Sequence, residues 1–304
     1  MKLGLLTAAL PGMTLQEVAQ WAADSGYQML EIACWPASTG KARRYAGVTH
    51  IDVESLDAAK AKEIRSMLDG LGLGISALAY YPNPLHPDLA HRETVVNHLK
   101  RVIDAAQLLE VPIVGSFVGA DQTKSAHENM EEFPMVWAPI VRYAAERGIK
   151  IAIENCPMLW HDTWPGGQNV AYSPTIWRQM FEAIPDDNFG LNLDPSHLIW
   201  QFIDEVRVVK DFAGRIFHVH AKDMEIDREL LYQGGVLTAG VGWAIPRLPG
   251  LGEVRWSPFI AALYAAGYDD VISVEHEDRA FEATEELVKR GFYLTRDVLR
   301  PLIA

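Results

Sequence analysis

Ile151-Ala152-Ile153-Glu154 is a short run of apolar residues that ends in a carboxylate, and three further runs in the second half of the chain have the same form. These are Leu191-Asn192-Leu193-Asp194, Phe217-His218-Val219-His220 and Ile272-Ser273-Val274-Glu275. A short run of branched apolar residues is typical of a buried strand, and a polar residue at its end lies at the carboxyl edge of a parallel sheet. Four such strands would bring three carboxylates and one imidazole to one edge.

Strand-like and helix-like segments alternate along the whole chain, a pattern that indicates repeated βα units around a parallel sheet. The predicted strands are residues 2–6, 29–32, 75–79, 113–117, 149–153, 189–193, 216–219 and 271–274. The predicted helices are residues 15–25, 56–71, 92–109, 133–147, 176–183, 204–212, 256–265 and 283–299. Eight units predict an α/β fold, a single (β/α)8 TIM barrel, whereas an open doubly wound sheet, the alternative, gives no reason for eight.

The length of 304 residues suits one barrel, so residues 1–304 are expected to form a single catalytic domain. Long segments follow the predicted strands at 34–53, 80–90, 157–175 and 221–255. In a barrel these βα loops build the C-terminal face, where active sites lie. Glycines that follow predicted helices (Gly26, Gly72 or Gly74, Gly148, Gly214 and Gly267) are expected to end them in the left-handed conformation.

Composition excludes several classes of protein. A formal net charge of −13 disfavours a nucleic-acid surface, which requires clustered Lys and Arg. The sequence contains no apolar run of about 18 residues, so no membrane span is expected, and we predict a cytoplasmic protein. Cys34 and Cys156 cannot form a disulfide framework and are expected to be reduced. A neutral or weakly charged small molecule is the expected partner, and the sequence leaves open whether the protein is a homo-oligomer.

The alternation of side chains along a strand provides a check on the four terminal residues. If Glu154, Asp194, His220 and Glu275 point into the barrel, the residues two positions earlier must do so too. Those residues are small or polar: Ala152, Asn192, His218 and Ser273. The residues between them are apolar and would face the helices: Ile153, Leu193, Val219 and Val274.

Buried carboxylates are costly unless a cation or a hydrogen-bond donor compensates them. Glu154, Asp194, His220 and Glu275 are therefore predicted to hold one divalent metal ion. Three oxygen donors and one nitrogen donor favour Mn²⁺, with Mg²⁺, Co²⁺ and Zn²⁺ as alternatives. The alternative for any one of these residues is a helix cap, a solvated loop residue or an ion pair.

Five motifs resemble those of the xylose-isomerase-like superfamily of barrels, which includes ketose 3-epimerases, hydroxypyruvate isomerase, inosose dehydratase and endonuclease IV. The motifs are I-E-N around Glu154, L-D-P-S-H at 193–197, H-V-H-A-K-D at 218–223, L-P-G-L-G-E-V-R-W at 248–256 and S-V-E-H-E at 273–277. The resemblance covers nearly the whole chain. It implies a single metal held by Glu154, Asp194, His220 and Glu275, with His197 near the substrate.

The resemblance also implies a chemistry. In the epimerases of this group the two glutamates are the acid and base on opposite faces of the sugar, which assigns catalytic roles to Glu154 and Glu275. Elementary chemistry agrees, because a metal that bridges a carbonyl and an adjacent hydroxyl acidifies the intervening C–H and stabilises a cis-enediolate. A glutamate bound through one oxygen could transfer protons with the other.

Some positions depart from the ketose 3-epimerase pattern. Ile226 stands where that pattern has an Arg about six residues after the metal-binding His, and Trp160 and His161 replace its second substrate-holding Glu. The H-A-K-D continuation instead resembles inosose dehydratase, and Lys222 would point inward with His220 to polarise a substrate oxygen. The alternative for Lys222 is an ion pair with Asp223 or a neighbouring acid.

Aromatic residues gather in the predicted loops, where rings could stack on the apolar faces of a sugar. Of these, Trp35 and Trp160 are predicted to bind substrate together with His161, His197 and Lys222. The alternative is that the rings only pack the loops.

We predict a metal-dependent sugar isomerase or epimerase. A lyase or dehydratase acting on a keto-sugar, an inosose or a 3-keto-glycoside is the second interpretation. A non-catalytic sugar-binding barrel or assembly subunit is the third. A nuclease like endonuclease IV is disfavoured, because the strands ending at Ala79 and Phe117 supply no extra histidine ligands.

Overall fold

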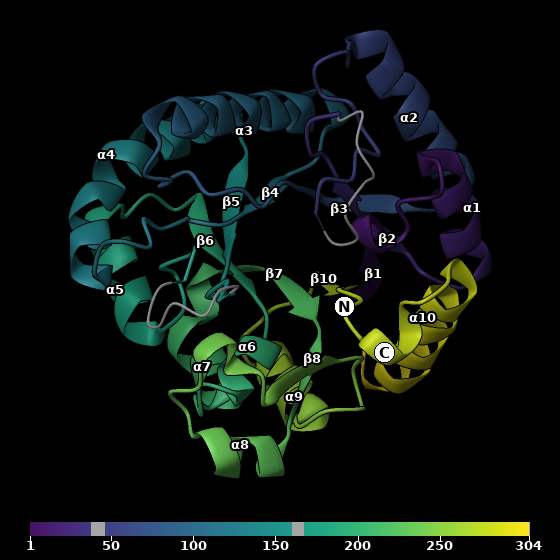
Figure 1. Cartoon of the computed structure of the whole chain (residues 1–304). Helices are drawn as coiled ribbons and strands as arrows, with labels where there is room; N and C mark the ends of the chain where they lie inside the picture. The colour runs from purple at the N-terminus through teal and green to yellow at the C-terminus, as the bar shows by residue number, and fades with distance from the viewer. Residues whose placement is uncertain (38–45, 160–166, 304) are drawn as a thin grey trace.

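The structure is a computed structural model that describes residues 1–37, 46–159 and 167–303. Its centre is a closed barrel of parallel strands in the order β1-β10-β7-β6-β5-β4-β3-β2, surrounded by helices (Figure 1). The barrel strands are β1 (Lys2–Leu6), β2 (Met29–Ala33), β3 (Gly74–Ala79), β4 (Ile113–Ser116), β5 (Lys150–Glu154), β6 (Phe189–Leu193), β7 (Ile216–Ala221) and β10 (Val271–Val274). This confirms the predicted TIM barrel and rules out the open sheet.

Several helices begin at residues whose side chains bind free backbone N–H groups. Thr14 and Ser125 each form a capping box with the glutamate three residues later, and Asp57, Asp88 and Asp204 accept N–H bonds in the same way. The α-helices are α1 (Leu15–Asp24), α2 (Ala58–Gly70), α3 (Leu89–Leu109), α4 (Ala126–Ala145), α5 (Pro174–Ala183), α6 (Ser196–Ile199), α7 (Glu205–Phe212), α8 (Arg228–Gly234), α9 (Trp256–Ala265) and α10 (Glu285–Leu299).

Some predicted boundaries were wrong. The helix predicted at 133–147 begins seven residues earlier, at Ala126, because the Ser125–Glu128 capping box sets its start and the helix continues through Pro134 and Pro139. Left-handed glycines do end helices at Gly26, Gly72, Gly148 and Gly267. Gly214 does not, because it lies within a short 3₁₀ turn between α7 and β7.

The segment 221–255, predicted as a loop, contains an antiparallel pair of strands, β8 (Asp223–Ile226) and β9 (Ala244–Arg247). With only four residues each and α8 between them, these strands leave no long alternating pattern in the sequence. The Asp223 carboxylate accepts bonds from the backbone N–H groups of Met224, Gly250 and Val254 and from the indole of Trp256, which fixes both ends of the segment.

The predicted register is confirmed. Ile153, Leu193, Val219 and Val274 are fully buried in the main apolar core between the strands and the helices. Asn192, His218 and Ser273 form hydrogen bonds inside the barrel. Both cysteines are free. Among the described helices, none is long and apolar enough to span a membrane.

Candidate functional site

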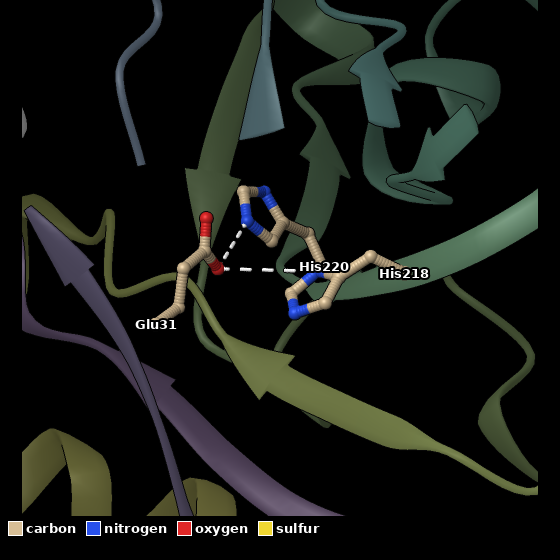
Figure 2. A group of neighbouring side chains, drawn as sticks. All are labelled: Glu31, His218 and His220. Carbon is tan, nitrogen blue, oxygen red and sulfur yellow. Dashed lines mark hydrogen bonds and ion pairs between the residues drawn. The ribbon is translucent and has the colours of Figure 1, made fainter. Parts of the chain in front are cut away.

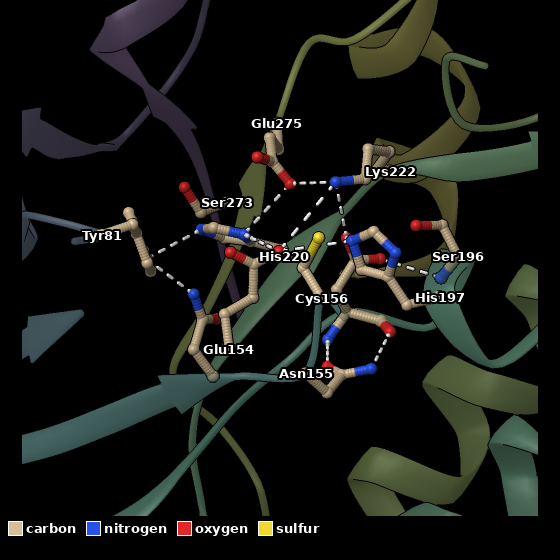
Figure 3. A network of polar contacts seen from close by, with 12 residues as sticks. Tyr81, Glu154, Asn155, Cys156, Ser196, His197, His220, Lys222, Ser273 and Glu275 are labelled. Atoms are coloured by element: carbon tan, nitrogen blue, oxygen red, sulfur yellow. Dashed lines mark hydrogen bonds and ion pairs between the residues drawn. The ribbon is translucent and has the colours of Figure 1, made fainter. Parts of the chain in front are cut away.

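Four buried side chains converge at the carboxyl end of the barrel: Glu154, Asp194, His220 and Glu275. Figure 3 labels Glu154, His220 and Glu275. Glu154 ends β5 and His220 lies in β7, while Asp194 and Glu275 follow β6 and β10 directly. Each offers one ligand atom, and the four atoms lie within 4.8 Å of one another. The structure thus brings together all four residues predicted from the strand ends.

Several atoms of this cluster lack a hydrogen-bond partner among the described residues. They are Glu154 Oε1, Asp194 Oδ2 and His220 Nδ1, and His197 Nε2 beside them also lacks one. Buried polar atoms without partners are rare because their desolvation is costly. Carboxylate oxygens and an imidazole nitrogen that face one point are the donor set of a divalent cation, so the residues present fit such an ion.

Hydrogen bonds between neighbouring strand ends fix the carboxylates. The Asn155 side chain donates to Asp194 O at 2.9 Å and accepts from Asp194 N at 2.8 Å, which ties β5 to β6. Asn169 donates to the carbonyl oxygens of Glu154 and Cys156 at 3.0 and 2.7 Å. Asp194 Oδ1 accepts from Ser196 N at 2.8 Å, which leaves Oδ2 for the cluster.

Lys222 contributes a positive charge to the cluster. Its buried ammonium lies 2.7 Å from Glu275 Oε2, 3.1 Å from Asp194 Oδ2, 3.3 Å from Glu277 Oε2 and 3.9 Å from Glu154 Oε1. Burial opposes this charge, but the carboxylates raise the pKa of Lys222 well above its ordinary value. Burial likewise opposes ionisation of Glu154, but His197, His220 and Lys222 lower its pKa below the ordinary value.

The structure places the remaining predicted residues as follows. His197, in α6, has Nε2 at 3.3 Å from Asp194 Oδ2 and 3.5 Å from Glu154 Oε1. The ring of Trp35 lies 6.1 Å from that of Tyr81, whose ring is 5.8 Å from His220, so Trp35 is connected to the cluster through Tyr81. Trp160 and His161 lie outside the described residues. Lys222 contacts neighbouring acids as the alternative interpretation allowed, while Asp223 instead binds backbone groups.

Glu31, in β2 on the other side of the barrel, was missed by the sequence analysis (Figure 2). Its Oε2 accepts from His220 Nε2 at 2.8 Å and from Ser273 Oγ at 2.9 Å, and its Oε1 accepts from Tyr81 at 2.6 Å. Burial opposes ionisation of Glu31, but His220 and His218 lower its pKa to about 2. Because Glu31 holds the Nε2 proton, the Nδ1 atom of His220 faces the other ligands, as a carboxylate–histidine–metal arrangement requires.

A polar network continues below Glu31 into the barrel. Asn192 donates to Tyr81 Oη at 2.8 Å, and its amide oxygen lies 3.0 Å from His218 Nδ1. His218 Nε2 lies 3.2 Å from Ser76 Oγ, and burial lowers the pKa of His218 to about 4. Gly115 leaves room for this network, since a Cβ there would come within 2.4 Å of Tyr81 Oη. A glutamate within an apolar strand, as in Leu30-Glu31-Ile32, is the signal that could have identified this support.

We expect Glu31→Gln to weaken Mn²⁺ binding by about 10- to 100-fold, because the charge that orients His220 is lost. Isothermal titration calorimetry measures the affinity. Glu225→Gln, a half-exposed glutamate on β8, is the matched control and should leave it unchanged. An unaltered Mn²⁺ affinity in Glu31→Gln would contradict the supporting role.

Comparison with protein families gives a match over most of the chain. Residues 19–297 match the family model described as xylose isomerase-like TIM barrel. The uncharacterized protein YfiH of Bacillus subtilis (strain 168) is 26% identical over 315 residues, which cover 91% of this chain and 93% of that protein. Inosose dehydratase of Geobacillus thermodenitrificans is 29% identical over 136 residues, which cover 44% of this chain and 42% of the enzyme.

Solved structures share the fold. A D-psicose 3-epimerase crystallised in the presence of D-fructose superposes with a TM-score of 0.73 at 15% identity, covering 100% of this chain and 99% of the epimerase. The IOLI protein with a bound zinc atom superposes with a TM-score of 0.72 at 19% identity, covering 99% of both chains. These likenesses show a common barrel.

Proposed function

Because this chain belongs to the xylose isomerase-like TIM-barrel family, we propose that it is a metal-dependent isomerase or epimerase acting on a sugar or sugar derivative. The observation that carries the proposal is the convergence of buried ligand atoms from Glu154, Asp194 and His220 that accept no hydrogen bond from the described residues, with Glu275 beside them. Isomerases, epimerases and dehydratases occur among the relatives and the fold neighbours, which supports an enzyme.

Glu154, Asp194, His220 and Glu275 would hold one divalent cation. Mn²⁺ is the proposed ion, since oxygen donors predominate, and the zinc atom in the IOLI protein keeps Zn²⁺ as an alternative alongside Mg²⁺ and Co²⁺. When bound, such a cation supplies a Lewis acid that polarises a carbonyl and makes the adjacent C–H more acidic.

Glu154 and Glu275 are the proposed proton carriers. Their carboxylates both approach Nδ1 of His220, with Glu154 Oε1 at 3.7 Å and Glu275 Oε2 at 3.3 Å from that atom. Each carboxylate has a second oxygen, Oε2 of Glu154 and Oε1 of Glu275, that could accept or return a proton. Removal on one face and return on the other gives epimerisation, while return to the neighbouring carbon gives isomerisation.

Lys222, His197 and Trp35 are proposed to bind the substrate. The Lys222 ammonium can donate a hydrogen bond to a substrate oxygen that gains negative charge. His197 Nε2 faces the same cluster and can bind a hydroxyl. Trp35 provides an apolar ring against which a sugar can pack. We also propose a role in substrate binding for Trp160 and His161, which follow β5.

A lyase is the second candidate, and Lys222 favours it. A buried ammonium beside two proton-carrying glutamates can protonate a leaving hydroxyl or alkoxide after the C–H proton is removed. The partial match to inosose dehydratase supports the same chemistry.

Turnover of candidate ketoses, inososes and 3-keto-glycosides in D₂O with Mn²⁺, followed by mass spectrometry, tests the proposal. An isomerase or epimerase incorporates deuterium into an intact carbon skeleton, whereas a lyase yields a product of lower mass. Removal of the metal with a chelator should stop either reaction. A protein that binds Mn²⁺ and sugar without exchange would be a non-catalytic sugar-binding barrel and would overturn the proposal.

A further inference from the structure

A cavity of about 400 Å³ is lined by residues of the segments that follow β5, β6 and β7. Its walls include Leu159, Tyr172, Trp200, Phe202, Val236 and Trp243, and no charged side chain lines it among the described residues. Small-molecule sites are concave, largely apolar and begin near this volume. The cavity is therefore suited to an apolar group of a small ligand.

The cavity and the cluster share the segments at the carboxyl ends of β5 and β6. Leu159 follows Glu154 by five residues, and Trp200 follows Asp194 by six. Gln201, also in the cavity wall, donates to His197 O at 2.6 Å, while His197 Nε2 lies 3.3 Å from Asp194 Oδ2. Helix α6 thus contains His197, which contacts the cluster, and the residues directly after α6 form part of the cavity wall.

The aromatic walls offer both a face and an edge to a planar group. Phe202 and Trp243 are stacked with ring centres 6.3 Å apart and planes inclined by 17°. Trp200 meets Trp243 edge-on at 6.4 Å and 74°. Planar groups gain from both arrangements beyond the burial of apolar area. The part of the cavity wall formed by Trp200, Phe202 and Trp243 therefore favours an aromatic ring over an aliphatic chain.

The opening of the cavity exposes apolar side chains. Phe202 is 65% exposed and Val236 50% exposed. Phe202 also has a left-handed backbone with φ of 57°, which is unfavourable for a bulky residue and occurs preferentially at ligand sites. An aromatic ligand that entered here would cover both side chains.

We propose that this cavity binds the apolar aromatic substituent of a keto-glycoside, whose sugar ring carries the reacting carbonyl and lies at the cation cluster. The inference rests on the proposed function, because it places a sugar beside Glu154 and Glu275. It narrows the substrate class to keto-glycosides that carry an aromatic aglycone. The larger substrate would be held by its substituent while the sugar reacts.

Three probes test the proposal: 2-naphthol, 2-naphthyl β-D-glucopyranoside and methyl β-D-glucopyranoside. Each is titrated into the full-length protein in the presence of Mn²⁺, and binding is measured by tryptophan fluorescence and calorimetry. We expect saturable binding of 2-naphthol and binding of the naphthyl glycoside about tenfold tighter or more than that of the methyl glycoside. Trp200→Ala and Phe202→Gly should each reduce 2-naphthol affinity about tenfold, and glycine at 202 accepts the left-handed backbone. Met135→Ala, an exposed apolar residue on α4, should have no effect.

Absence of saturable 2-naphthol binding, or binding that both cavity variants leave unchanged, would overturn the proposal. Two additional probes, 2-naphthyl galactoside and 2-naphthyl mannoside, test other sugars. If all three naphthyl glycosides bound no tighter than 2-naphthol, the proposal would also be overturned. If the protein self-associated, if Trp200→Ala and Phe202→Gly weakened that association, and if 2-naphthol did not bind, the cavity would be assigned to contact with a second copy of the chain. Failure of calorimetry to detect Mn²⁺ binding, with 2-naphthol still bound in the cavity, would overturn the proposed function and leave the aromatic site standing.

Discussion

Glu154→Gln and Glu275→Gln are each expected to slow the exchange of substrate hydrogen with solvent by about a thousandfold. Glutamine keeps the shape of the side chain and one ligand oxygen but cannot carry a proton between substrate and solvent. The rate of deuterium incorporation in D₂O, measured by mass spectrometry at saturating Mn²⁺, provides the test. Saturation is required because both residues are also proposed metal ligands.

The matched control is Glu225→Gln, since Glu225 lies on β8, is half-exposed and pairs with Arg247 rather than with the cluster. Its exchange rate should equal that of the unchanged protein. Retained exchange in Glu154→Gln or Glu275→Gln, with Mn²⁺ shown to be bound, would remove that residue from proton transfer. Loss of both exchange and Mn²⁺ binding would instead assign it to metal binding alone.

Lys222→Met is expected to have opposite effects on the metal-free and metal-bound protein. Without metal, removal of the ammonium leaves buried carboxylates uncompensated, and the free energy of unfolding should fall by about 3–5 kcal/mol. With metal, the affinity for Mn²⁺ should rise by about tenfold, because the ammonium that lies 2.7 Å from Glu275 and 3.1 Å from Asp194 no longer opposes a dication. Urea unfolding with and without Mn²⁺, together with calorimetry, measures both effects.

Lys124→Met provides the comparison, because Lys124 forms an exposed ion pair with Glu132 of the kind that contributes less than about 1 kcal/mol. It should change neither quantity appreciably. If Lys222→Met left the metal-free stability unchanged, or weakened Mn²⁺ binding, the ammonium and the cation would not share the same carboxylates.

The barrel was predictable because its strands and helices have distinct sequence periods and capping residues. The predicted strand at 189–193 matches β6, and that at 271–274 matches β10. The β8–β9 pair was not predictable, since two four-residue strands separated by α8 leave no periodic signal. The early start of α4 was obscured by Pro134, although the Ser125–Glu128 pair marked it.

The convergence of four strand-end residues was predictable because parallel strands of a barrel place their carboxyl ends at one rim. Glu31 was not, because it lies within its strand and its contact with His220 joins residues 189 positions apart. The aromatic wall of the cavity depends on a contact between distant residues, since Trp200 and Trp243 meet only after α6 and the β8–β9 segment fold together. Sequence pattern thus predicts which groups reach the rim, while their supporting contacts depend on closure of the barrel.

The bond between Glu31 and His220 has a consequence for protein engineering. The candidate ligands all come from the second half of the chain, whereas the carboxylate that orients their only imidazole comes from the first half. Chimaeras that join half-barrels of different relatives would separate these partners unless both halves carry matching residues. Such hybrids could fold correctly yet bind metal poorly, and restoring the glutamate at position 31 would be the first repair to attempt.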